Sequence, residues 1–220
     1  MSEVAEVTRY RSDAQNPFRT QRFKAVRQII RAHLENAAEC SVLDLGGTPE
    51  YWRLLASDFD WARVKLTIVN LREAPSDGPF ADVQVGDARS LPQFSDQSFD
   101  VVHSNSVIEH VGRWEDMQSM AREVRRLGRR YFVQTPYFWF PLEPHARTPF
   151  LHWLPESMRY RLVMARKCGF WEKASSVGEA MTTVQSAVML DKAQFRFLFP
   201  EASIVTEYAY GMPKSLMAIR

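Results

Sequence analysis

Residues 40–50 constrain the fold more than any other stretch, because an apolar run there breaks into a pair of glycines: CSVLDLGGTPE. The run predicts a short buried strand. Gly46 and Gly47 supply backbone freedom and carry no Cβ that would keep a ligand away. Thr48 is a favoured N-cap residue, and Pro49 suits the first position of a helix. The stretch therefore predicts a strand, a tight turn and the start of a helix.

Such a turn places a helix N-terminus beside the carboxyl end of a strand, where open α/β sheets bind nucleotide-like ligands. Asp44 lies at the mouth of this turn. Its carboxylate would repel a pyrophosphate and would suit a cationic group. The turn therefore indicates a ligand site that favours a ligand with positive charge.

Strand and helix patterns alternate along the chain. The spacing predicts strands at residues 42–45, 64–69, 82–85, 99–105 and 131–135, with helices between them. Gly128 suits the residue that ends the helix at 114–127. Two more strands, 202–208 and 215–219, are joined by a tight connection. We predict an α/β fold: a doubly wound, mostly parallel seven-stranded sheet that ends in an antiparallel hairpin.

We predict one domain over residues 1–220, in which residues 1–38 form an N-terminal arm and helix. Turn formers occupy residues 75–79. Between residues 137 and 178 the alternation breaks into crowded aromatics and prolines, which indicates an aromatic-rich helical insertion over the carboxyl edge of the sheet. Its rings either wall an acceptor pocket or cover the sheet edge or a second subunit, so a homodimer stays open.

Composition limits the partners. The chain has 45% hydrophobic and 25% charged residues, as globular proteins do, and its net charge of +2 does not indicate a nucleic-acid partner. No apolar run approaches the ~18 residues of a membrane span, and the N-terminus shows no signal peptide. Cys40 and Cys168 lack metal-ligand spacing, which favours a reduced, cytoplasmic protein.

Polar residues end the predicted strands in order along the sheet. Beyond Asp44 these are Asn70, Asp87 with Ala88, and Asn105. Each alone is an ordinary turn residue, but several at one edge indicate a shared ligand site. An amide at the second strand can reach ribose hydroxyls, and a carboxylate at the third can accept from an exocyclic amine.

Three segments together resemble the class I S-adenosylmethionine-dependent methyltransferases of the type 11 kind: VLDLGG at 42–47, VGDARSLP at 85–92 and FDVVHSNSVIEHV at 99–111. The resemblance covers about residues 40–136. It implies S-adenosylmethionine as cofactor, held by Asp44, Gly46 and Gly47 at the methionine end, by Asn70 and Leu71 at the ribose, by Asp87 and Ala88 at the adenine, and by Asn105 as a floor. The family usually has Glu or Asp where Asn70 stands, and its glycine turn usually has more glycines.

Elementary chemistry agrees with this resemblance. S-adenosylmethionine is a sulfonium cation, which suits Asp44, and its carboxylate suits the backbone N–H groups of the turn. Methyl transfer to an oxygen also needs a base for the acceptor's proton, for which histidine is best placed near neutral pH. His145 in the insertion and His110, after Glu109 at the fourth strand, are the two candidates, and Glu109 and Glu143 can orient a histidine. We expect His103 and His152 to be packing residues.

The prediction is thus a methyltransferase that acts on a small-molecule acceptor, by O-methylation of a sugar, glycan-type or other hydroxyl. We expect no metal site, because no His, Asp or Glu residues have ligand spacing along the chain. A nicotinamide-dependent oxidoreductase would need a third glycine after Gly47. A nucleic-acid methyltransferase would need an Asn/Asp-Pro-Pro-aromatic motif, where residues 104–107 read SNSV. A catalytically idle S-adenosylmethionine-binding protein is the remaining alternative.

Overall fold

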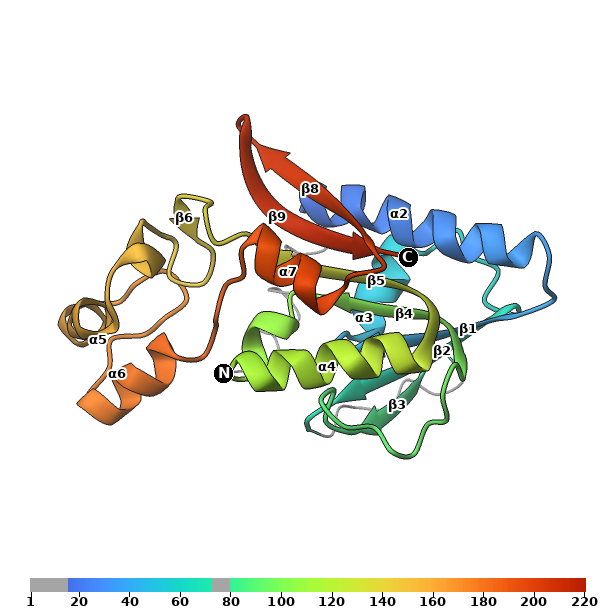
Figure 1. The fold of residues 1–220 in the computed structure, drawn as a ribbon, viewed down its shortest axis with the longest axis horizontal. Coiled ribbons are helices and arrows are strands. Elements are labelled where there is room, and N and C mark those ends of the chain that lie inside the picture. Colours follow the sequence, from blue (N-terminus) through green and yellow to red (C-terminus); the bar gives the residue numbers. More distant parts are fainter. Residues whose placement is uncertain (1–15, 73–79) are drawn as a thin grey trace. The chain divides into compact units, whose positions relative to one another are not determined.

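Within the described residues, 16–72 and 80–220, the computed structural model holds a seven-stranded sheet in the order β3-β2-β1-β4-β5-β9-β8 (Figure 1). Its strands are β1 Cys40–Leu45, β2 Val64–Asn70, β3 Asp82–Val85, β4 Phe99–Asn105, β5 Gly128–Pro136, β8 Ser203–Ala209 and β9 Met212–Ile219. Strand β1 runs parallel to β2 and β4, β2 runs parallel to β3, and β8 and β9 form an antiparallel pair. The predicted sheet is confirmed, and its order reverses between β1 and β4, where such sheets bind ligands.

The chain divides into two compact units. Unit 1 comprises Met1–Asn105, Met120–Val133 and Ile219–Arg220, and unit 2 comprises Ser106–Ser119 and Gln134–Ala218. The single domain over residues 1–220 stays a prediction. The predicted arm before residue 16 and the turn at 75–79 lie outside the described residues.

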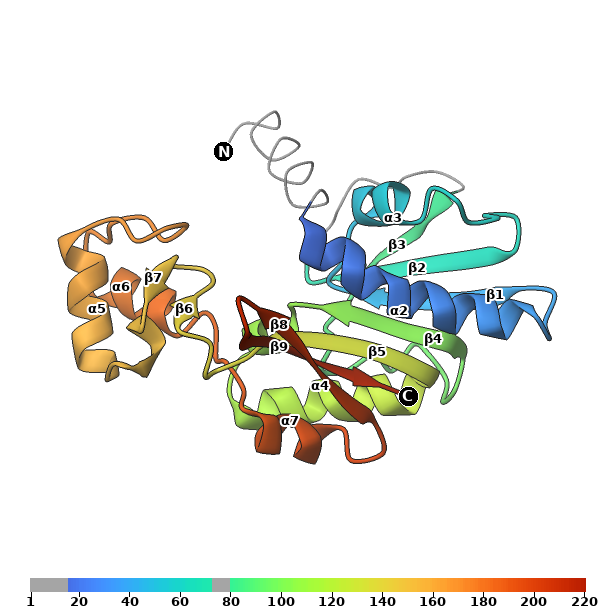
Figure 2. The same cartoon turned by 90° about the horizontal axis from the view of Figure 1, so that it is seen from above.

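Helices cover both faces of the sheet in unit 1: α2 (Pro17–Leu34) and α3 (Pro49–Leu55) lie on one face, and the second half of α4 (Trp114–Leu127) lies on the other (Figure 2). Helix α2 turns Phe23, Val26 and Ile30 inward, and each is at most 1% exposed. Helix α3 begins as predicted, with Thr48 as N-cap and a proline in its first turn. Capping satisfies an N–H group that the helix itself leaves unpaired.

Helix α4 ends at Leu127, directly before Gly128, as predicted. This glycine is the first residue of β5, and it is not among the glycines with positive φ. It is needed for space: a Cβ there would stand 2.8 Å from Cγ2 of Val102 and 2.7 Å from the carbonyl oxygen of Arg130. The residue therefore allows α4 to run directly into the next strand.

Unit 2 contains the predicted insertion and builds small cores of its own. Its further elements are η2 Ile108–His110, β6 Leu142–Glu143, β7 Thr148–Pro149, η3 Leu151–Trp153, α5 Glu156–Ala165, α6 Val177–Val184 and α7 Lys192–Leu198. One core joins α5 to α6 through Val163, Ala180 and Val184. Asp191 and Gln194 form a capping box at α7. The sequence did not predict α6.

Candidate active site

The carboxyl end of β1 in unit 1 is organised around the buried carboxylate of Asp44, which is 0% exposed. Trp52 Nε1 in α3 donates to Oδ2 over 2.6 Å, and His103 Nδ1 in β4 lies 2.7 Å from Oδ1. The strand register pairs Asp44 directly with His103. Because a carboxylate only accepts hydrogen bonds, Nδ1 of His103 is assigned the hydrogen. Burial, together with the charge of Asp44, raises the pKa of the Tyr51 hydroxyl beside this pair.

This network shapes the glycine turn. A Cβ on Gly47 would stand 1.6 Å from Oδ2 of Asp44, so no side chain fits there. Gly46 has a φ of 78°, a conformation that glycine adopts without strain. The glycine turn therefore lies directly against the carboxylate of Asp44, which places a negative charge beneath the turn. The direct contact between Asp44 and a ligand stays a prediction.

The end of β2 is tied to the same turn. Asn70 Nδ2 donates to the carbonyl oxygen of Gly47 over 2.9 Å, and Gly46 N donates to the carbonyl oxygen of Val69 over 2.9 Å. The amide oxygen of Asn70 takes no part in that bond, so it can accept from a ribose hydroxyl. Leu71, the next residue, is 70% exposed. Asn70 is thus bonded to the glycine turn, and the contacts of Asn70 and Leu71 with a ribose stay predictions.

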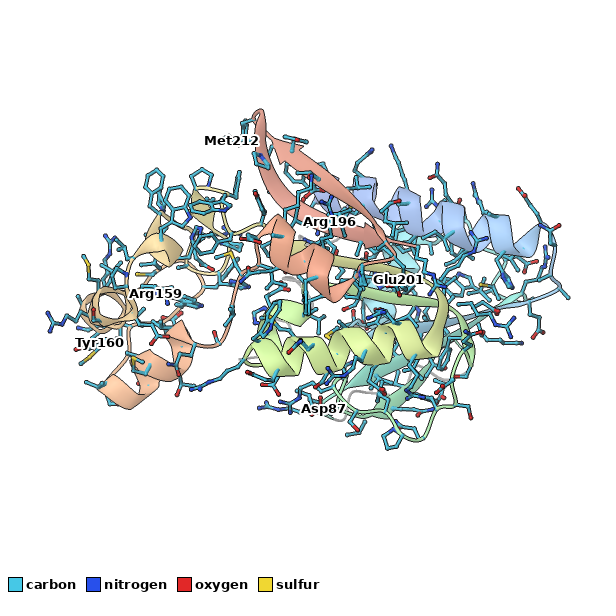
Figure 3. The ribbon with its side chains drawn as sticks, viewed as in Figure 1. Asp87, Arg159, Tyr160, Arg196, Glu201 and Met212 are labelled. Carbon is cyan, nitrogen blue, oxygen red and sulfur yellow. The ribbon has the colours of Figure 1, made fainter. Side chains whose placement is uncertain are left out.

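Asp87 follows β3 (Figure 3) and binds the side chain of Arg89. Arg89 Nε donates to Oδ1 and Nη2 donates to Oδ2, over 2.9 and 2.6 Å. These bonds lower the pKa of the Asp87 carboxyl, so this group is ionised at neutral pH. Ala88 lies between the two residues. An adenine amine at Asp87 would share the carboxylate with Arg89, a partner that the sequence analysis missed.

Asn105 ends β4, and its Oδ1 accepts from Arg22 Nη1 of α2 over 3.0 Å. Arg22 is only 8% exposed. A buried arginine on the apolar side of a helix is uncommon, and that position was the signal available in the sequence. Arg22, Trp52 and the role of His103 do not follow from local sequence pattern, because each acts across the sheet from another element.

The second group of candidate residues lies in unit 2 and is named here the histidine cluster: Glu109, His110, Glu143 and His145. Nε2 of His110 lies 3.1 Å from Nε2 of His145, although the two residues are 35 positions apart. His145 Nδ1 lies 2.7 Å from Oε1 of Glu143, and His110 Nδ1 lies 2.7 Å from the carbonyl oxygen of Ser186. The structure thus joins two histidines that the sequence offered as separate alternatives.

Both carboxylates of the histidine cluster are buried. Glu109 is 1% exposed, and its Oε2 accepts from Thr135 Oγ1 over 3.0 Å, whereas its Oε1 has no hydrogen-bond partner among the described residues. Burial raises the pKa of the Glu109 carboxyl, and His110 opposes that rise. Glu143 is 2% exposed and accepts from the backbone N–H of Ala146 as well as from His145.

A cavity of about 460 Å³ lies next to the histidine cluster in unit 2. It is lined by Gly112, Arg113, Phe138, Glu143, His152, Glu156, Arg159, Trp171, Val184, Gln185, Ala187, Val188 and Met189. Arg159 comes from α5, as Tyr160 beside it does (Figure 3). Glu143 is both part of the cavity wall and a member of the histidine cluster. Gln185 and Ala187 flank Ser186, which binds His110.

The aromatic insertion contributes only in part to this cavity. Phe138 lines it, whereas Trp139 and Phe150 are 55% and 51% exposed. His152 is buried, and its Nε2 lies 2.7 Å from the carbonyl oxygen of Phe138, as expected of a packing residue. Burial lowers the pKa of His152. Across residues 16–72 and 80–220, no helix combines the length and apolarity needed to cross a bilayer.

The fold is that of the class I methyltransferases. Its marks are a mostly parallel seven-stranded sheet with a final antiparallel hairpin and a glycine turn above a buried acid at β1. Residues 43–130 match the family model described as a methyltransferase domain. This segment, 88 of the 220 residues, resembles methyltransferase domains, and the match and the fold together support an S-adenosylmethionine-dependent methyltransferase.

Solved structures of similar fold include a SAM-dependent methyltransferase from Methanosarcina mazei, at 15% identity over 86% of this chain and 94% of that one, with a TM-score of 0.51. The PH0226 protein from Pyrococcus horikoshii is 14% identical over 94% and 92%, with a TM-score of 0.52. A Rhodobacter sphaeroides protein described as a candidate zinc-dependent alcohol dehydrogenase is 11% identical over 87% and 88%, with a TM-score of 0.51. At these identities the likeness shows the fold alone. No curated protein matches the chain.

Proposed function

We propose that this methyltransferase transfers the methyl group of S-adenosylmethionine to a hydroxyl of a small molecule, of the sugar or glycan type. The observation that carries the proposal is the 460 Å³ cavity, whose wall includes Glu143, the partner of His145. A cavity of that volume suits a small acceptor. Its wall mixes Phe138 and Trp171 with charged groups, a combination that suits the apolar face and the hydroxyls of a sugar ring.

The cofactor takes the strand-end residues of unit 1. In this proposal Asp44, Gly46 and Gly47 serve its methionine end, Asn70 and Leu71 its ribose, Asp87 and Ala88 its adenine, and Asn105 its floor. The negative charge of Asp44 stabilises the sulfonium and ammonium groups, and the N-terminus of α3 suits the carboxylate. The protein would act in the cytoplasm, on neither nucleic acid nor membrane, and as a homodimer where the exposed aromatic rings meet a second copy.

The acceptor loses its hydroxyl proton at the histidine cluster, with His145, His110 and Glu109 as catalytic residues. Methyl transfer is an in-line displacement, so positioning provides much of the rate enhancement, and loss of the proton makes the oxygen a better nucleophile. Glu143 is the positioning residue, because its hydrogen bond orients the ring of His145.

The test is transfer from methyl-labelled S-adenosylmethionine to a panel of monosaccharides, phenols, amines, DNA and RNA. We expect labelled ethers from the hydroxyl compounds. His145→Ala should lower turnover about 100-fold or more while the affinity for S-adenosylmethionine stays unchanged. His33→Ala, a histidine of unit 1, is the matched control and should retain full turnover. Label on amines or nucleic acid alone, or full turnover in His145→Ala, would refute the proposal.

A further inference from the structure

The hydrogen bonds of His110 and His145 fix where their protons lie. Each Nδ1 faces an oxygen that only accepts: a carboxylate oxygen of Glu143 for His145, and the carbonyl oxygen of Ser186 for His110, both at 2.7 Å. Each Nδ1 must therefore carry a hydrogen. In a neutral imidazole the other nitrogen, Nε2, then presents a lone pair.

The two Nε2 atoms lie close together. The Nε2 atoms are 3.1 Å apart, and the rings meet edge to face at 79°. Two lone pairs at this distance repel each other, so the arrangement requires a positive centre that both can bind. Two nitrogens at about 2.0–2.1 Å from one metal ion, with an angle of about 90–109° between them, would be about 2.8–3.4 Å apart. The observed separation falls in that range.

Glu109 lies close to the two histidine nitrogens. One carboxylate oxygen of Glu109 and one nitrogen of each histidine all lie within 4.8 Å of one another. Its Oε1 is buried without a hydrogen-bond partner among the described residues, which is costly unless something binds it. The terminal torsion of a glutamate is soft, so the carboxylate can turn onto an ion between the rings. A proton shared by the two histidines would leave that oxygen unsatisfied.

We infer that Glu109, His110 and His145 bind a divalent transition-metal ion of the zinc class, with an open position for a further ligand. Two imidazoles and a carboxylate favour Zn²⁺, Co²⁺ or Fe²⁺ over Mg²⁺ and Ca²⁺, which prefer oxygen ligands alone. Histidines that ligate metals characteristically donate their other N–H to a carboxylate or a backbone carbonyl, and both histidines do so here. His110 is exposed, which leaves solvent access for the open position.

The role of the ion rests on the proposed function, whereas its binding does not. A hydroxyl bound at the open position would have a lowered pKa and release its proton to water. The oxygen would then attack the methyl carbon of S-adenosylmethionine. A carbon–oxygen bond forms, the carbon–sulfur bond breaks, and its electron pair stays on sulfur as a neutral thioether. No metal site was predicted from the sequence, because His110 and His145 are 35 positions apart and spacing rules do not reach that far.

The test uses the full chain, stripped with a chelator and then titrated with Zn²⁺ in competition with a chromophoric chelator. We expect one equivalent to bind, and Co²⁺ to give visible absorption bands at the same stoichiometry. His110→Ala and His145→Ala should each weaken Zn²⁺ binding 100-fold or more. Glu143→Gln, which changes only a partner of a ligand, should weaken it about 10–100-fold.

The control is His33→Ala, which removes a ligand from another group of possible metal ligands, His33, Cys40 and Asp100 in unit 1. It should leave the affinity unchanged. No Zn²⁺ bound at micromolar concentrations, or binding that persists in both His110→Ala and His145→Ala, would overturn the metal site. Because His110 is exposed, its variant should fold normally, as its circular dichroism would confirm. Tight Zn²⁺ binding without transfer to any hydroxyl would overturn the proposed function instead.

Discussion

At the scale of single residues, Asp44 shows how one buried charge can organise both the core and the glycine turn. Its carboxylate receives hydrogen bonds from Trp52 and His103, and its Oδ2 occupies the space that a side chain at position 47 would need. A buried carboxylate is tolerated only when its oxygens are satisfied. Asp44 therefore needs Trp52 and His103 as hydrogen-bond donors. It also needs a glycine at position 47, which lets the turn approach its carboxylate.

Asp44→Asn should lower the free energy of unfolding by about 2–4 kcal/mol, because the new NH₂ group would face a donor and leave a buried partner unsatisfied. Trp52→Phe keeps the ring packing and removes one donor, so its cost should be about 1–3 kcal/mol. Urea denaturation of both variants measures the difference. An Asp44→Asn protein within about 0.5 kcal/mol of the unchanged protein would contradict this account.

Asp87→Ala should weaken the binding of S-adenosylmethionine about 10–100-fold, because a hydrogen bond to a charged acceptor would be lost. Isothermal titration calorimetry measures it. Asp82→Ala is the matched control, since Asp82 carries the same charge at the exposed start of β3, the strand that precedes Asp87. It should leave the affinity within about twofold. Equal affinities for both variants would remove Asp87 from the cofactor site.

At the scale of elements, the segment between β3 and β4 in unit 1 is attached to α4 by charged hydrogen bonds. Glu123 in α4 accepts from the backbone N–H of Leu91 and from Arg126 Nε, both over 2.8 Å. Arg126 Nη1 donates in turn to the carbonyl oxygen of Phe94 over 2.8 Å. This segment has little regular structure, so the two side chains satisfy backbone groups that a sheet or helix would otherwise satisfy.

Glu123→Gln should cost about 1–2 kcal/mol of the free energy of unfolding at neutral pH, because charge-assisted bonds become neutral ones. Hydrogen bonds from Arg126 lower the pKa of Glu123 from its ordinary value of 4.5 in the folded protein. The contribution of Glu123 is therefore fully present above pH 4.5 and is lost as the pH falls through the lowered folded pKa. Urea denaturation of Glu123→Gln and of the unchanged protein at several pH values measures this. The difference between their free energies of unfolding should shrink as the pH falls.

The control for this prediction is Glu115→Gln, at the exposed start of the same helix. It should change the free energy of unfolding by less than about 0.5 kcal/mol. A difference between Glu123→Gln and the unchanged protein that stays constant down to the acid transition would show that the charge of Glu123 is not what stabilises this segment.

At the scale of the whole molecule, the sequence predicted what depends on local pattern and missed what depends on pairing at a distance. The start of α3 follows from Thr48 and Pro49, and two strand ranges were predicted to the residue. The bond between Asp44 and His103 joins residues 59 positions apart, and it follows only once β1 lies beside β4. The histidine cluster could not be predicted for the same reason. The close approach of Gly128 to Val102 was not predictable either, because the two residues are remote in sequence.

The division into two units raises the question of whether the molecule unfolds in one step. Helix α4 and strands β5 and β9 each run across a boundary between the units, so neither unit keeps all of its elements without the other. We therefore expect one cooperative transition, as a single domain gives. Each unit holds one buried cysteine, Cys40 in unit 1 and Cys168 in unit 2.

Thiol labelling in urea reports on the two units separately. Burial, reinforced by Asp100, raises the pKa of the Cys40 thiol to about 12, so it should not react in the folded protein at pH 8. Cys168 is 3% exposed and should also be protected. In the Cys168→Ala variant the remaining thiol, Cys40, reports on the opening of unit 1. In the Cys40→Ala variant the remaining thiol, Cys168, reports on the opening of unit 2. After correction for each variant's stability, both thiols should become reactive at the same urea concentration as the far-ultraviolet signal is lost. Reaction of Cys168 at clearly lower urea, while Cys40 stays protected, would mean that unit 2 opens on its own.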